Sequence, residues 1–142
     1  MNITFDGFLR ENPNCSKYAT YPDAVAVFEL LSEERNIIAM IDASEGGKPA
    51  LSACVFELES FFDALQNPTI DFNDTFTRTV VGRMIKSILA PFGYEVTQQK
   101  DLPKAARGKY FTSASCYAKT GVATLEVARR IVPASQIKAL LP

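Results

Sequence analysis

The sequence predicts an α+β fold, a mostly helical single domain of 142 residues with a small antiparallel hairpin. Apolar residues recur every three or four positions over three long stretches, which is typical of amphipathic helices. After Gly93, residues 94–98 alternate and residues 110–117 are rich in aromatic and β-favouring side chains, which indicates two strands. A chain of this length can bury roughly two-thirds of its unfolded surface in one core.

The predicted domain has four consecutive segments. Residues 1–19 form an extended arm, 20–92 a helical part, 93–119 a hairpin and 120–142 a C-terminal helical segment. The arm, or edge strand, is predicted from the short alternating stretch that begins the chain and from the breakers Asn12, Pro13 and Asn14 that follow it. No repeat or long linker divides the chain.

The first helix is predicted over residues 21–34. Thr20 is its expected N-cap, Asp23 stands in the acidic position of a capping box, and Pro22 lies in the first turn, where its missing N–H does no harm. The apolar run 37–41 fits either a buried strand or a continued helix, because periodicity does not separate the two at this length. Residues 44–47 are predicted to form a turn.

The second helix is predicted from Pro49 to Leu65. Proline is tolerated in a first helical turn. Its apolar face is expected to hold Leu51, Cys54, Val55, Leu58, Phe61, Phe62 and Leu65. The carboxylates of Glu57, Glu59 and Asp63 lie off this face and are interpreted as a solvated flank.

The third helix, residues 76–92, has the strongest pattern. Asn73 or Asp74 is the expected cap, Pro91 should disturb the last turn, and Gly93 can end the helix in the left-handed conformation. The face predicted to enter the core holds Phe76, Val80, Val81, Met84, Ile85, Ile88, Leu89 and Phe92. The opposite face is small and basic and holds Thr79, Gly82, Arg83 and Lys86.

The two predicted strands flank a basic loop, residues 101–109. After Thr120 and Gly121, residues 122–132 are interpreted as a helix, although Thr124 to Val127 also alternate in strand fashion. Ser135 is the expected cap of a last short helix.

The composition argues against catalytic and metal-dependent functions. The chain has no histidine, so it lacks the commonest general base, the usual nucleophile partner and the usual zinc nitrogen. Its three cysteines are far apart and show no zinc spacing. The sequence therefore predicts no catalytic residue, no metal and no cofactor. Absence of a leader-like or membrane-spanning apolar run predicts a cytoplasmic protein.

Charge is divided unevenly between the two halves. Residues 1–74 hold four Lys or Arg and thirteen Asp or Glu, a net charge of −9, whereas residues 75–142 hold eleven and three, a net charge of +8. Such asymmetry indicates a surface for a polyanion or an acidic segment with its own partner. The two halves folding against each other would equally neutralise it.

A basic-faced helix followed by a basic-tipped hairpin resembles, in element order, the winged-helix arrangement of DNA-binding proteins. The resemblance covers residues 49–117 and departs from the pattern in the long connection 67–74. It implies a regulatory nucleic-acid-binding protein whose helix enters the major groove of DNA while the wing contacts the backbone. The residues expected to bind are Thr79, Gly82, Arg83 and Lys86 on the helix, Lys100 just before the loop, and Lys104, Arg107 and Lys109 in the loop.

The alternative function is a protein-interaction module without catalytic activity. Its working surface would be the acidic helical half, with Glu29, Glu33, Glu34, Glu57, Glu59 and Asp63. A homodimer in which the acidic half of one copy meets the basic half of another fits the same charges.

Overall fold

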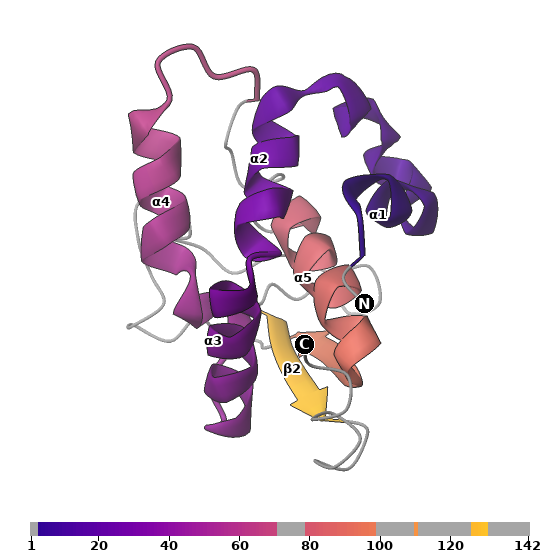
Figure 1. Ribbon diagram of the computed structural model, residues 1–142, viewed down its shortest axis with the longest axis vertical. Helices are drawn as coiled ribbons and strands as arrows, with labels where there is room; N and C mark the ends of the chain where they lie inside the picture. Colours follow the sequence, from indigo (N-terminus) through magenta and orange to yellow (C-terminus); the bar gives the residue numbers. More distant parts are fainter. Residues whose placement is uncertain (1–2, 71–78, 99–109, 111–125, 131–142) are drawn as a thin grey trace.

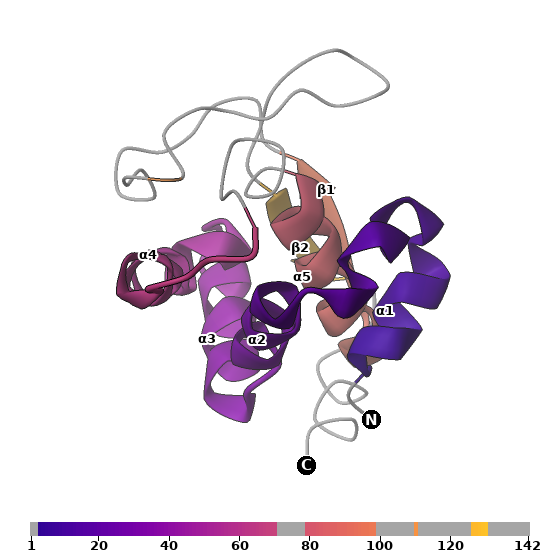
Figure 2. The ribbon, with the colours of Figure 1, turned by 90° about the horizontal axis from the view of Figure 1, so that it is seen from above.

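The computed structural model describes residues 3–70, 79–98, 110 and 126–130. Its elements are α1 (Phe5–Glu11), η1 (Pro13–Thr20), α2 (Pro22–Leu31), α3 (Glu34–Glu45), η2 (Ala50–Ala53), α4 (Val55–Ala64), α5 (Val81–Leu89), η4 (Ala90–Phe92), β1 (Tyr94–Gln98) and β2 (Glu126–Arg130). In both ribbon views α5 lies in the middle, with α1 on one side of it and α4 on the other (Figure 1, Figure 2).

The helix α5 is the centre of the core because its apolar face packs against several neighbours. It contacts α1, α2, α3 and β1. The prediction of this helix is confirmed over residues 81–92, and its predicted core residues there are all buried. Pro91 turns the last part into the 3₁₀ helix η4, and Gly93 ends it with a φ of 84°. The predicted caps Asn73 and Asp74 lie outside the described residues.

The N-terminal segment is helical, so the predicted extended arm is wrong. The side-chain oxygen of Thr4 accepts a hydrogen bond of 3.0 Å from the Gly7 backbone nitrogen and caps α1. Phe5 and Phe8 are one helical turn apart, and both rings contact Phe28 of α2 at centroid distances of 5.6 Å. The spacing of these two phenylalanines was therefore helical and only superficially alternating.

The helices α2 and α3 replace the single predicted helix and the ambiguous run after it. The run 37–41 is helical. Thr20 does not cap α2: Tyr21 occupies the N-cap position without a side-chain hydrogen bond. Asp23 is buried and instead accepts a hydrogen bond of 2.8 Å from the Thr69 hydroxyl, which fastens the segment after α4 to the start of α2.

The second predicted helix is confirmed in outline and begins as the 3₁₀ helix η2 before α4. Its apolar face holds buried Leu58 and Phe62 as expected. Glu59 is also buried, so the prediction of a solvated carboxylate at this position is wrong. Of the predicted turn at 44–47, residues 44 and 45 are the end of α3, and Gly46 and Gly47 form the turn, with Gly47 at a φ of 76°.

The prediction of an α+β fold with a winged-helix-like centre is wrong, because the described structure is mostly helical. The strand 94–98 is present, but its antiparallel partner is β2, with Val96 opposite Ala128. Residues 126–130 are thus a strand and part of no helix. Of the predicted strand 110–117 only Tyr110 is described, and it lies in a bend. Residues 111–117 and the final predicted helix lie outside the described residues.

Candidate protein-interaction surface

Two exposed apolar side chains mark one side of the molecule. Phe56, at the start of α4, is 65% exposed, and Ile38, on α3, is 42% exposed. They are the only large hydrophobic residues in the described part of the chain that are classed as exposed. Together with Glu33, Arg35 and Glu57 they form what we call the α3–α4 surface.

Arg35 joins the two helices across this surface. Its Nη1 atom donates a hydrogen bond of 3.1 Å to Glu57 of α4, and a second bond from Nη2 makes the pair bidentate. Its Nε atom donates a bond of 2.8 Å to Glu33 at the start of α3. The hydrogen bonds to Glu57, and to a smaller extent the bond to Glu33, raise the pKa of Arg35 above its ordinary value. The side chain therefore keeps its positive charge.

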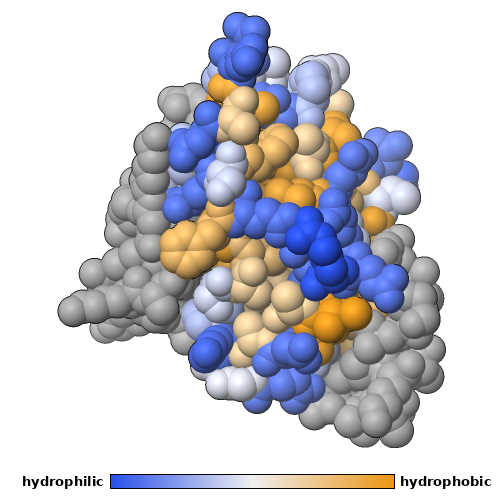
Figure 3. All heavy atoms as spheres, turned by 60° about the vertical axis from the view of Figure 1, so that its left-hand side comes forward, coloured by the Kyte–Doolittle hydropathy of each residue, from blue (hydrophilic) through white to orange (hydrophobic). Residues whose placement is uncertain are grey.

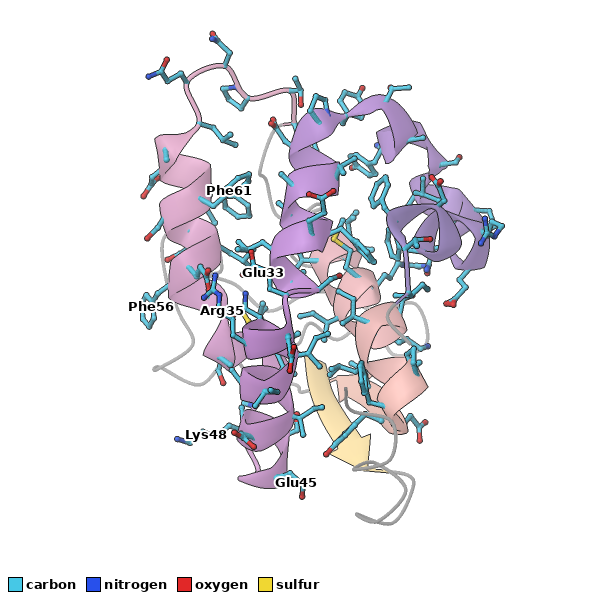
Figure 4. The ribbon with its side chains drawn as sticks, in the orientation of Figure 1. Glu33, Arg35, Glu45, Lys48, Phe56 and Phe61 are labelled. Carbon is cyan, nitrogen blue, oxygen red and sulfur yellow. The ribbon has the colours of Figure 1, made fainter. Side chains whose placement is uncertain are left out.

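The apolar and charged groups are neighbours. Ile38 follows Arg35 by three residues and therefore lies one turn farther along the same side of α3. Phe56 precedes Glu57 and points away from the body of the molecule in Figure 4, in which Arg35 and Glu33 lie together beside it. Figure 3 shows this side of the molecule, with charged residues running across a largely apolar face. The surface combines apolar contact area with carboxylates at its edge.

Sequence reasoning missed Phe56 and Ile38 as surface residues. Phe56 lies off the apolar stripe predicted for the second helix, and an aromatic residue off a stripe is a signal of exposure. Once residues 37–41 are read as helix, Ile37, Met40 and Ile41 share the buried face and Ile38 points outward. The ambiguity between strand and helix concealed this signal.

The acidic residues of the alternative prediction have divided roles. Glu29 and Glu34 are exposed, whereas Glu33 and Glu57 are both hydrogen-bonded to Arg35. Glu59 and Asp63 both contact Tyr110. Only part of the predicted acidic set is therefore open to a partner.

The residues predicted to bind nucleic acid differ in their exposure to solvent. On α5, Gly82 is buried, Arg83 is half-buried and Lys86 is exposed, and Thr79 is half-buried just before the helix. The Arg83 Nε atom is buried without a hydrogen-bond partner among the described residues. Lys100, Lys104, Arg107 and Lys109 lie outside the described residues.

The basic side of α5 has neighbours that the sequence did not indicate. Arg83 and the η1 residue Lys17 both lie near Cys15, where their charges oppose the rise that burial causes in the pKa of its thiol. A carboxylate lies on this side as well, because the Ser87 hydroxyl donates a hydrogen bond of 3.4 Å to Glu11 of α1. The basic face is thus partly covered by the N-terminal helices.

Neither described cysteine is suited to nucleophilic chemistry. Burial, with a smaller contribution from the Glu57 carboxylate, raises the pKa of Cys54 to about 12. Burial also raises the pKa of Cys15. Both thiols therefore stay protonated near neutral pH, and the thiol form is a poor nucleophile.

The described residues show neither a helix suited to crossing a membrane nor a metal-binding cluster of side chains. Among them, no helix combines the length and the apolar composition that a bilayer crossing requires. No group of three or more acidic, cysteine or histidine side chains there is placed to hold a metal ion. Comparison of the chain with protein-family models, with curated proteins and with solved structures finds no match.

Proposed function

We propose that this protein is a protein-interaction module whose α3–α4 surface binds a basic and apolar segment of a partner protein. The observation that carries the proposal is the exposure of Phe56 beside the bidentate pair of Arg35 and Glu57. Aromatic residues and arginine are enriched among the side chains that dominate the energy of protein interfaces. Both types occur here, on two helices that the Arg35–Glu57 ion pair connects.

The apolar contribution of Phe56 is large enough to matter. A phenylalanine side chain buries roughly 150–250 Å² when covered, and 65% of Phe56 is free. At about 25 cal/mol per Å², covering the free part contributes about 2–4 kcal/mol. Arg35 is already hydrogen-bonded to Glu57 beside it, so part of the side-chain ordering that docking requires is present before a partner binds.

The charge around the surface favours a basic partner. Residues 3–70 hold eleven Asp or Glu and four Lys or Arg, a net charge of −7. Glu33 and Glu34 are exposed at the start of α3, so a partner cation beside the apolar contact meets carboxylates. Charges at the rim of an interface mainly raise the association rate and exclude acidic partners.

A model ligand tests this proposal directly. The probe is a fluorescent helical peptide with lysine on one face and leucine on the other, and binding is measured by anisotropy. We expect Phe56→Ala to weaken binding at least about tenfold, which corresponds to about 1.4 kcal/mol. Binding should also weaken in high salt, because the Debye length falls from about 10 Å at 0.1 M to about 3 Å at 1 M.

The matched control is Gln66→Ala, an exposed change outside the α3–α4 surface. It should leave the affinity unchanged, and a peptide with glutamate in place of lysine should not bind. Equal affinity of the wild-type protein and Phe56→Ala would refute the proposal. So would tight self-association that Phe56→Ala abolishes in sedimentation, because the surface would then serve a second copy.

Nucleic-acid binding by the basic face of α5 stays a prediction. The exposure of Lys86 supports it, as does the position of both Lys17 and Arg83 near Cys15. We expect mobility shifts with duplex or single-stranded DNA at low salt, and the Arg83→Ala, Lys86→Ala double variant should lower the log-log salt slope by about 0.9 per lost contact. An absent shift at low salt, or an identical slope for the double variant, would dispose of it.

A further inference from the structure

Tyr110 is held on α4 by three separate contacts. Its backbone nitrogen donates a hydrogen bond of 2.6 Å to Glu59, and its hydroxyl donates one of 2.8 Å to Asp63. Its ring meets Phe62 edge to face, with a centroid distance of 5.1 Å and an interplanar angle of 86°. We call the α4 residues Glu59, Phe62 and Asp63 the tyrosine seat. Together they bind a backbone N–H, an aromatic ring and a phenol hydroxyl.

The seat comes from one turn of helix. Glu59 and Asp63 are four residues apart and so lie one above the other on α4, with Phe62 beside them. Glu59 is only 8% exposed. A buried carboxylate is stable only where donors satisfy it, and the Tyr110 N–H is one of these donors.

The seat continues the α3–α4 surface along α4. Phe56 precedes Glu59 by three residues and Asp63 by seven, the spacing of a single stripe on a 3.6-residue helix. The sequence around the seated residue is Arg107-Gly108-Lys109-Tyr110-Phe111, which is basic and aromatic. This is the chemistry that the proposed function assigns to the partner segment.

We propose that Tyr110 acts as an internal ligand that covers one end of the partner-binding surface, at Glu59, Phe62 and Asp63. The inference rests on the proposed function and adds the regulation of that surface. A partner segment with a tyrosine next to lysine or arginine replaces Tyr110 on Glu59, Phe62 and Asp63. An internal ligand on a short tether acts at a millimolar effective concentration, so a free segment competes poorly until Tyr110 leaves.

The test uses the chain's own sequence as probe, a fluorescent peptide with the sequence of residues 104–112, added to full-length protein. Tyr110→Ala should bind this peptide at least about tenfold more tightly than the wild-type protein, because its seat is empty. Tyr110→Phe loses the hydroxyl bond to Asp63 but keeps the ring and the backbone N–H, so it should show a smaller gain. The double variant Tyr110→Ala, Asp63→Ala should lose the gain.

Two controls make each outcome decisive. A peptide with alanine in place of its tyrosine should bind none of the proteins, and circular dichroism checks that each variant is folded. Equal or absent binding of the native peptide to wild-type protein, Tyr110→Phe and Tyr110→Ala overturns the inference. A different result is that the lysine–leucine peptide fails to bind while the peptide of residues 104–112 still binds Tyr110→Ala. That result overturns the proposed function and leaves the inference about the tyrosine seat standing.

Discussion

Replacing Phe8 by alanine is expected to lower the free energy of unfolding by about 3–5 kcal/mol. The side chain is fully buried, and its ring packs against Phe5 and Phe28 at centroid distances of 5.9 and 5.6 Å. Its loss removes the contact that fastens α1 to α2 and leaves a cavity between them. Urea denaturation followed by circular dichroism measures the change.

The control for this prediction is the same substitution at an exposed position. Phe56→Ala should change the free energy of unfolding by no more than about 0.5 kcal/mol, because most of the side chain is already in contact with water. A small effect at Phe8 would show that α1 is not part of the cooperative core. A large effect at Phe56 would assign that ring a structural role in place of a binding one.

Replacing Ile85 by alanine should lower the free energy of unfolding by about 2–5 kcal/mol. Ile85 is fully buried on α5, the helix that contacts α1, α2, α3 and β1. Neighbouring side chains cannot easily fill the cavity left by the Ile85 side chain, because several elements pack together around it. Thermal and urea unfolding of the variant provide the measurement.

The adjacent residue is the matched control. Lys86 is exposed on the same helix, so Lys86→Ala should alter stability by at most about 0.5 kcal/mol. If both variants lost the same free energy, the division of α5 into a core face and a solvent face would be wrong. A negligible loss at Ile85 would contradict the central place of this helix.

The sequence predicted the parts of the fold that depend on local pattern. The apolar face of α5 follows from spacing alone, and the end of its 3₁₀ extension follows from Pro91 and Gly93. The predicted arm failed because Ile3, Phe5 and Phe8 are too few to separate a strand period from a helical one, and the Thr4 cap favours the helix. Short segments are settled by caps and by packing, which spacing does not record.

Features that depend on distant residues were not predictable in this way. The pairing of β1 with β2 joins segments that no local signal connects, and Glu59 accepts a hydrogen bond from Tyr110, which is 51 residues away in the sequence. The candidate surface depends on Arg35 reaching Glu57 of another helix. Carboxylates on a helix flank give the same sequence pattern whether they accept hydrogen bonds from water, from an arginine or from a backbone N–H.

The pairing of β1 with β2 also bears on the order in which parts of the chain fold. The two strands are separated by residues 99–125, so bringing them together closes a long loop, and the entropy of closure is lost before any ladder bond forms. A two-stranded ladder is marginally stable by itself. Here β1 rests on α5, and the Tyr94 hydroxyl donates a hydrogen bond of 2.7 Å to Glu45 of α3. We therefore expect the ladder to form on helices that are already packed.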